Sequence, residues 1–212
     1  MLLKASLLAL ATAFVLPAHD PLTDLVIGAP MPAADKVMKD VIGVDRSLSA
    51  INGENGLLVI FSCNTCPFVV GSEGSAGWEG RYPELGNFCR TNKVGFALVN
   101  SNSNKRDAGD SFTDMQARYK TQNYNMHYLL DEDNVVADAF AARTTPHVFL
   151  FNKDMKLVYK GAIDDNVDDA KAVTKHYLND AITALVAGKA VEPATTKNLG
   201  CSIKRKPVEH KH

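Results

Sequence analysis

Continuous hydrophobic runs mark the buried strands of this chain. Residues 57–61 (LLVIF) and 94–100 (VGFALVN) are almost entirely apolar, which is typical of strands covered on both faces of a sheet. Shorter runs predict three further strands, at residues 128–130, 147–151 and 156–159. The last two are separated only by a short turn, so we expect an antiparallel hairpin. Looser alternation over residues 44–51 indicates an edge strand or hairpin.

Apolar residues spaced three and four apart predict helices between these strands. They cover residues 78–90, 111–120 and 134–142, and a closing helix spans residues 168–187 before Gly188. The resulting order, β-α-β-α-β-α-β-β-α, predicts an α/β fold with a central mixed β-sheet flanked by helices on both faces. Parallel neighbours in such a sheet require right-handed crossovers.

The N-terminus has the pattern of a targeting segment. Lys4 precedes an apolar run over residues 5–16, and the small residue Ala18 follows it. A positive start, a short apolar run and a small residue at the cut are typical of a signal peptide, here residues 1–18. We therefore expect an exported protein, periplasmic or secreted. The alternative interpretation is a buried N-terminal helix.

Composition narrows the function classes. The 212 residues, 46% of them hydrophobic, suit one compact domain, and the net charge of −1 offers no electrostatic attraction to nucleic acid or an anionic membrane. We expect no nucleic acid partner and no stable membrane insertion after signal cleavage. Four cysteines in a chain of this length are too few for a disulfide scaffold.

Two of the cysteines form a CxxC pair directly after a predicted buried strand. Cys63 and Cys66 are followed by Pro67, which is tolerated in the first turn of a helix. Free N–H groups at a helix start lower a thiol pKa, and two thiols at this spacing can close a disulfide. We expect Cys63 to be the more exposed, attacking thiol and Cys66 to be the deeper, resolving one. A structural disulfide or half of a zinc site are the alternatives.

A proline opens the strand at 147–151. Pro146 follows Thr145 there, and we predict that the Thr145–Pro146 bond is cis and lies against the CxxC pair. The alternative is a trans proline that only marks the start of the strand.

Several stretches carry a family resemblance: FSCNTCPFVV, LVNSNSN, YLLDEDNVVADAFAARTTPHVFLFNKDMKLVYKGAIDD and GCSIK. Together they resemble the thioredoxin-like superfamily, closest to redoxin or alkyl hydroperoxide reductase/thiol-specific antioxidant-like proteins with a CxxC motif. The resemblance covers residues 25–204. It implies a thioredoxin-like fold with an N-terminal extension and a helical insertion within 101–127. The domain would span residues 19–190, and residues 191–212 would form a polar C-terminal tail.

The resemblance also assigns roles at the site. It implies Cys63 as nucleophile, Cys66 as resolving thiol and Pro146 as the cis-proline, with Asn64, Thr65 and Thr145 in support. Asn-Thr between the cysteines is neither the Gly-Pro of general disulfide reductases nor the Pro-His of a strong oxidant. The redox potential therefore stays open. No cofactor or metal is expected.

Two further departures from family patterns concern proton transfer and peroxide chemistry. Leu57 stands where thioredoxins have a buried carboxylate, so we consider Glu54 and Glu73 for the proton of Cys66. Peroxiredoxins use Pro-x-x-x-Thr/Ser-x-x-Cys, and here neither the Pro nor the Thr is in place. Arg143 is the candidate that a peroxidase would recruit.

The leading hypothesis is a thiol–disulfide oxidoreductase that exchanges its Cys63/Cys66 pair with protein or small-molecule thiols. A peroxiredoxin-like thiol peroxidase with an antioxidant role is the first alternative. A copper(I) chaperone, with His147 beside the two thiols, is the second. Cys89 is expected to be buried and inert. Cys201 is either a third exchange partner or idle.

Overall fold

The computed structural model describes residues 23–207. Its strands are β1 (Lys39–Asp40), β2 (Gly56–Phe61), β3 (Val94–Asn100), β4 (His127–Leu130), β5 (Thr144–Thr145), β6 (His147–Asn152), β7 (Leu157–Gly161) and β8 (Cys201–Ser202). Its α-helices are α1 (Leu48–Ile51), α2 (Pro67–Val70), α3 (Tyr82–Thr91), α4 (Phe112–Thr121), α5 (Val135–Ala139) and α6 (Tyr177–Val186). Short 3₁₀ helices lie at Glu79–Arg81, Ser103–Lys105 and Ala170–Ala172.

The central sheet is mixed, as the sequence predicts. One set of strands has the order β1-β4-β3 and the other the order β2-β6-β7. The two sets meet at β3 and β2, where the N–H of Ser62, just beyond β2, donates to the carbonyl of Val99 at 2.9 Å. β3 and β4 are parallel, whereas β6 is antiparallel to both β2 and β7. The hairpin expected over residues 147–159 is therefore confirmed.

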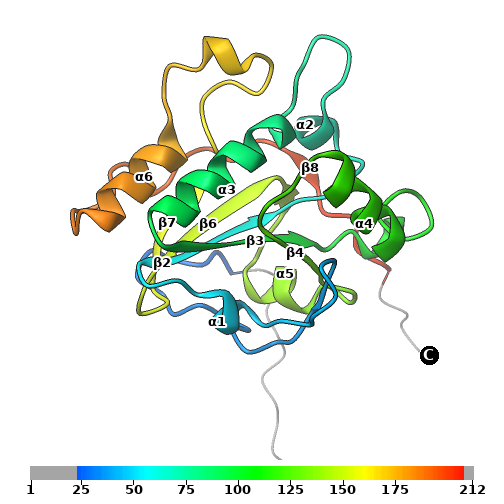
Figure 1. The fold of residues 1–212 in the computed structure, drawn as a ribbon, viewed down its shortest axis with the longest axis horizontal. Helices are drawn as coiled ribbons and strands as arrows, with labels where there is room; N and C mark the ends of the chain where they lie inside the picture. Colours follow the sequence, from blue (N-terminus) through cyan, green and yellow to red (C-terminus); the bar gives the residue numbers. More distant parts are fainter. Residues whose placement is uncertain (1–22, 208–212) are drawn as a thin grey trace, which may run out of the picture.

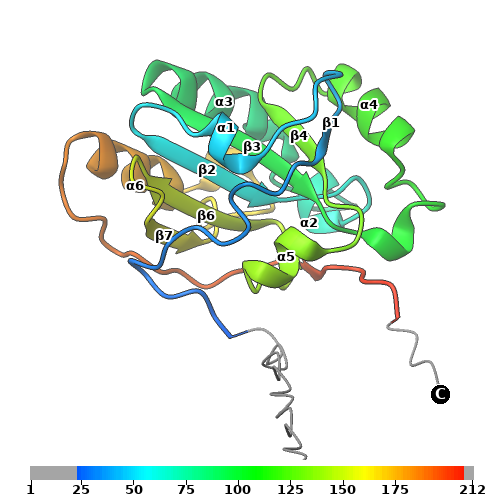
Figure 2. The ribbon, with the colours of Figure 1, turned by 90° about the horizontal axis from the view of Figure 1, so that it is seen from below.

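Helices cover both faces of the sheet (Figures 1 and 2). α2, α3, α4 and α6 contribute buried side chains to the core on one face, and α1 and α5 to the core on the other. Along β2 the side chains alternate, so that Leu58 and Ile60 enter the first core while Val59 and Phe61 enter the second. β2 is buried at every position, which accounts for its unbroken hydrophobic sequence.

The edge strand or hairpin expected over residues 44–51 is wrong for most of its length. Only Arg46 pairs as a bridge, with Met38, and Leu48–Ile51 is the helix α1. Ser47 caps this helix by accepting a hydrogen bond from the N–H of Ala50 at 3.3 Å. The cap and the burial of Leu48 and Ile51 at a spacing of three residues favour a helical turn over a strand.

The closing helix is shorter than the 168–187 expected. It begins at Tyr177, and only a 3₁₀ turn at Ala170–Ala172 precedes it. Side chains in this region bond to the backbone instead: Asn166 Oδ1 accepts from the N–H groups of Asp168 and Asp169 at 3.0 and 2.9 Å. Such local bonds compete with helix formation, which explains the late start.

The C-terminal segment lies against the domain rather than extending from it. Its course is the red-orange trace in Figure 2. It first runs along β7, where the N–H of Lys160 donates to the carbonyl of Ala194 at 3.1 Å. It then forms β8, antiparallel to β5, and buries Ile203. The segment is polar, as expected for residues 191–212, but backbone hydrogen bonds hold its described part, up to residue 207, on the fold.

The predicted signal peptide, residues 1–18, lies outside the described residues. Within residues 23–207 the structure contains no helix with the length and apolar character that a membrane crossing requires.

Candidate active site

The two cysteines of the CxxC pair lie in the loop that connects β2 to α2. Cys66 is the N-cap of α2, with an extended backbone (φ −83°, ψ 125°), and Pro67 is the first residue of the helix. Both cysteines belong to the core on the α3 and α6 side of the sheet, and both are free thiols. The sequence prediction that the pair bridges a strand and a helix is therefore confirmed.

Thr145 contacts both sulfur atoms. Its Oγ1 lies 3.2 Å from Cys63 Sγ, and its carbonyl oxygen accepts a hydrogen bond from the Cys66 thiol at 3.1 Å. The following peptide bond, Thr145–Pro146, is cis. Both parts of the prediction for this position, the cis bond and its place against the cysteines, are confirmed.

Both thiols are buried, so Cys63 is not the exposed thiol that the sequence predicts. Cys63 is only 1% exposed and Cys66 3% exposed, so Cys63 is not the more accessible sulfur. The physical reason is that Cys63 follows directly from a fully buried strand, whereas Cys66 lies at the start of a helix. Cys66 also borders a cavity of about 210 Å³ that Cys63 does not line, and Lys105 and Lys204 lie at the edge of the same cavity.

Hydrogen bonding gives the two thiols opposite pKa shifts. The bond from Cys63 is the largest cause that lowers the pKa of Cys66 to about 5, although burial opposes it. The thiol of Cys201, its backbone N–H and the hydroxyl of Thr145 act in the same direction. The pKa of Cys63 is raised by the same bond, by burial and by the negative charge of Asp110. The shared hydrogen bond thus favours a thiolate within the pair, with the proton kept on the other sulfur.

Asp110 fixes the residues between the two cysteines. It is fully buried, and its carboxylate accepts from the N–H of Asn64 at 2.7 Å and the hydroxyl of Thr65 at 2.8 Å. Asn100 and Asn102 donate to the same carboxylate at 2.8 and 3.1 Å. Asn64 and Thr65 thus support the site by anchoring its loop to the helical insertion.

Sequence reasoning missed Asp110 and considered two other carboxylates. Glu54 forms an exposed ion pair with Lys93 at 2.7 Å, and Glu73 is exposed on a turn. A usable signal was the cluster of small polar residues that follows β3, because the ends of parallel strands gather at one edge of a sheet.

Cys201 joins the site from the far end of the chain. In the β5–β8 ladder it lies opposite Thr145, the residue that contacts both other thiols. Cys201 packs against the core that contains Cys66, and both residues line the same cavity. Burial, together with its bond to Cys66, raises the pKa of Cys201 to about 11. Cys201 is partly exposed, unlike the other two thiols.

The structure does not bring His147 to the thiols. It lies on the opposite face of the sheet, where its ring packs against Phe149 with centroids 4.4 Å apart. Burial lowers its pKa to about 4. The copper ligand set considered above is therefore not assembled, because alternate residues of a strand point to opposite faces. Within residues 23–207, no cluster of three His, Cys, Asp or Glu side chains is arranged to hold a metal ion.

Arg143 and Cys89 are the two remaining candidates from the sequence. Arg143 is more than half exposed and pairs with Asp24 at 3.0 Å. Cys89 is 1% exposed on α3, and burial raises its pKa to about 12. Its expected burial is confirmed, and its raised pKa fits an unreactive thiol.

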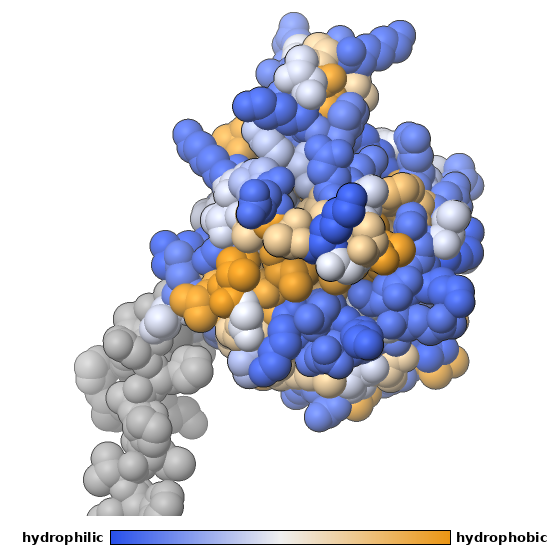
Figure 3. All heavy atoms as spheres, turned by 90° about the vertical axis from the view of Figure 1, so that its left-hand side faces the viewer, coloured by the Kyte–Doolittle hydropathy of each residue, from blue (hydrophilic) through white to orange (hydrophobic). Residues whose placement is uncertain are grey.

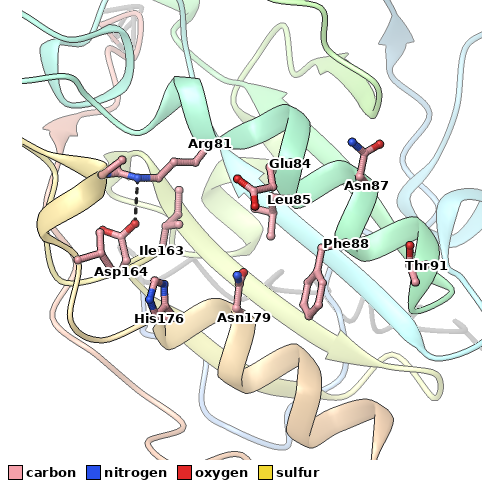
Figure 4. A pocket seen from close by; sticks show the side chains of 12 residues that line it. Arg81, Glu84, Leu85, Asn87, Phe88, Thr91, Ile163, Asp164, His176 and Asn179 are labelled. Atoms are coloured by element: carbon pink, nitrogen blue, oxygen red, sulfur yellow. Dashed lines mark ion pairs between the residues drawn. The ribbon is translucent and has the colours of Figure 1, made fainter.

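A larger cavity, of about 400 Å³, lies between α3 and α6 and is lined by no cysteine (Figure 4). At one end Arg81 pairs with Asp164 at 3.2 Å, and Trp78 donates to the same carboxylate at 2.8 Å. Figure 3 views the α6 side of the molecule and shows a patch of hydrophobic side chains bordered by hydrophilic ones. This side of the protein is thus hollowed and partly apolar, but no cysteine lines the cavity.

Solved structures with the same fold place the chain in the thioredoxin-like class of α/β proteins. An uncharacterized conserved protein from Geobacillus kaustophilus is 30% identical, with 86% of this chain and 93% of that chain covered and a TM-score of 0.76. For a hypothetical protein from Sinorhizobium meliloti the identity is 29%, the coverage 87% and 97%, and the TM-score 0.76. A peroxidoxin from Mycobacterium tuberculosis shares only the fold, at 13% identity, 77% and 98% coverage and a TM-score of 0.54.

The family model for redoxin matches residues 27–175, and the chain belongs to the redoxin family. No match is found among curated protein sequences. Family membership, together with paired cysteines at the end of β2, makes thiol redox chemistry the function class of this site.

Proposed function

We propose that the protein is a thiol–disulfide oxidoreductase in which Cys66 is the attacking thiol and Cys63 resolves the intermediate. The observation that carries this proposal is a pair of thiols three residues apart at the start of α2, of which Cys66 borders the cavity and has a lowered pKa. Thiolates, not thiols, attack disulfides. Because its pKa is lowered, Cys66 is the thiol that reacts at neutral pH.

The exchange proceeds in two displacements. The Cys66 thiolate attacks one sulfur of a substrate disulfide, a mixed disulfide forms, and the other substrate sulfur leaves as a thiolate. Cys63 then loses its proton and attacks Cys66 Sγ, which releases the second substrate thiolate and forms the Cys63–Cys66 disulfide. Two electrons pass from the protein to the substrate, and the reverse sequence oxidises a substrate dithiol.

This order reverses the roles that the family resemblance implies. Cys66, not Cys63, borders the cavity through which a substrate sulfur would enter. Cys63 is held against Thr145 with a raised pKa, which suits a thiol that acts second. The cis bond at Pro146 follows Thr145, whose carbonyl accepts from Cys66 and which lines the same cavity.

A disulfide-reduction assay tests the proposal. Reduced protein is mixed with oxidised glutathione, or with insulin as a disulfide-bonded protein, and the thiols released are measured. We expect Cys66→Ser to abolish release and the matched control Cys89→Ser to leave it unchanged. Equal activity in the wild-type protein and the Cys66→Ser variant would overturn the proposal.

Thiol peroxidase activity is the second candidate, because the same lowered pKa of Cys66 suits attack on a hydroperoxide. The thiolate would take one peroxide oxygen to become a sulfenic acid and release an alcohol or water. Condensation with Cys63 would then form the disulfide and release water. Peroxide consumption no faster than with a free thiol, in a protein that still reduces disulfides, would remove this activity and an antioxidant role.

We further propose that the chain is exported, on the strength of Lys4, the apolar run over residues 5–16 and Ala18. Sequencing the mature N-terminus after expression with its own leader tests this. A first residue at position 19 or nearby supports export, and an intact Met1 in the cytosolic fraction contradicts it.

A further inference from the structure

Backbone hydrogen bonds anchor the chain on both sides of Cys201. Before it, the N–H of Thr196 donates to the carbonyl of Lys160 at 3.1 Å. After it, the N–H of Ile203 donates to the carbonyl of Arg143 and the N–H of Lys204 to Asn102 Oδ1, both at 2.9 Å. These bonds hold Cys201 at a set position beside β5.

Gly200 lets this segment approach the active site closely. A Cβ atom at this position would lie 2.4 Å from the carbonyl oxygen of Thr145 and 3.1 Å from the nitrogen of Pro146. Any larger residue would push the strand away from β5. The same Thr145 carbonyl accepts from the Cys66 thiol, so Gly200 brings Cys201 to the atom that already positions Cys66.

Cys201 is oriented toward Cys66 and not toward Cys63. Cys201 and Cys66 both line the cavity of about 210 Å³, which Cys63 does not line. Cys66 is therefore flanked by a thiol on each side, one buried and one partly exposed.

We propose that Cys201 is a third redox-active thiol, which resolves mixed disulfides on Cys66 by forming a Cys66–Cys201 disulfide. The proposal rests on the function proposed above and extends it: Cys66 has two resolving partners. Because Cys201 lines the same cavity as Cys66, it resolves mixed disulfides whose substrate part remains in that cavity after the first displacement. Cys63 resolves mixed disulfides from the buried side of Cys66.

The proposed steps conserve atoms and electrons. Cys66 thiolate attacks oxidised glutathione, giving a Cys66–glutathione disulfide and one glutathione thiolate, which takes up a proton from water. The Cys201 thiol then loses its proton to water and its sulfur attacks Cys66 Sγ. The second glutathione leaves as a thiolate and takes up a proton. Cys66 and Cys201 lose two electrons as their disulfide forms, and these electrons reduce oxidised glutathione to two glutathione thiols.

Peptide mapping of the full-length chain tests this inference. Reduced protein is mixed with one equivalent of oxidised glutathione, quenched with acid and N-ethylmaleimide at successive times, and digested without reduction. In a Cys63→Ser variant we expect the Cys66–glutathione adduct to decay into a Cys66–Cys201 disulfide. In the Cys63→Ser, Cys201→Ser double variant the adduct should persist, with a decay at least tenfold slower. Cys63→Ser, Cys89→Ser is the matched control and should behave like Cys63→Ser.

A second variant keeps the test independent of cysteine removal. Gly200→Val removes no thiol but displaces Cys201. Added to Cys63→Ser, it should also lengthen the lifetime of the glutathione adduct on Cys66. If the Cys63→Ser variant keeps glutathione on Cys66, and Cys201 is found alkylated by N-ethylmaleimide as a free thiol, the inference fails. The proposed function would still stand, because Cys66 would have attacked the disulfide. Absence of any adduct on Cys66 in every variant would instead contradict the proposed function itself.

Discussion

At the scale of single residues, the site is defined by the donors that converge on one sulfur. Cys63, Thr145 and Cys201 all contribute hydrogen bonds that favour the ionised form of Cys66. Only the Thr145 carbonyl accepts from the thiol form, at 3.1 Å. A buried sulfur without such donors behaves in the opposite way, as Cys89 shows with its pKa raised to about 12.

The first prediction concerns the titration of Cys66. Absorbance of the thiolate near 240 nm should appear with a midpoint at about pH 5, and Cys66→Ser should lack this step. Because the folded-state pKa lies below the ordinary value of 9.0, ionisation of Cys66 stabilises the native state above about pH 9. That contribution is lost as the pH falls toward 5. A lowest thiolate midpoint between 8 and 9 would contradict the arrangement described here.

The second prediction concerns Asp110. Asp110→Ala leaves the buried donors of Asn64, Asn100 and Asn102 without an acceptor, so the free energy of unfolding should fall by about 2 kcal/mol or more in urea denaturation. Asp110→Asn removes the charge but keeps an acceptor, and it should lower the pKa of Cys63. An unchanged Cys63 pKa in Asp110→Asn would show that this charge does not act on the pair.

At the scale of elements, α4 carries its own start signal next to the site. Ser111 is the N-cap, and it forms a capping box in which its hydroxyl accepts from the N–H of Asp114 at 3.0 Å. Asp114 in turn accepts from the N–H of Ser111 at 3.1 Å. Since Ser111 follows Asp110 directly, the same turn that starts the helix also presents the carboxylate to the CxxC loop.

The third prediction follows from this cap. Ser111→Ala should reduce the free energy of unfolding by about 1 kcal/mol, because one N–H in the first turn loses its partner. Thermal or urea denaturation measures the loss, and Thr121→Ala, at the other end of α4, serves as a control for general effects on the helix. A loss at Thr121 equal to that at Ser111 would argue against the cap.

At the scale of the whole molecule, a buried ion pair joins the helical insertion to the body of the domain. Arg118 on α4 donates to both carboxylate oxygens of Glu79 at 2.5 Å, and Tyr124 donates to the same carboxylate at 2.5 Å. Glu79 is only 5% exposed. The insertion that carries Asp110 is thus fastened to the segment just before α3, on the same face as the thiols.

The fourth prediction tests this connection. Arg118→Ala leaves a buried, uncompensated carboxylate and should destabilise the protein by about 3 kcal/mol, whereas an exposed pair contributes far less. Lys93→Ala, which breaks the exposed pair with Glu54, is the matched control and should cost under about 1 kcal/mol. Similar losses in both variants would refute the structural role of the Glu79 pair.

The sequence was informative where local pattern decides structure and silent where distant segments meet. The buried strands, the hairpin and the place of Pro146 follow from hydrophobic runs and local residue types. The contact of Cys201 with Cys66 depends on β8 pairing with β5, across more than fifty residues of chain, and no local pattern encodes it. The burial of Cys63 and the hydrogen bonds from Asp110 to the CxxC loop likewise depend on which elements cover that loop.

The most direct test of the account is the rate at which each thiol of the pair attacks a disulfide. Two double variants are compared at pH 6 with an aromatic disulfide reagent. The first combines Cys63→Ser with Cys201→Ser and keeps Cys66. The second combines Cys66→Ser with Cys201→Ser and keeps Cys63. Serine at position 63 keeps a hydroxyl donor in place of the Cys63 thiol. The account predicts that Cys66 reacts about tenfold faster or more, because it is the ionised sulfur. Faster reaction at Cys63 would contradict it.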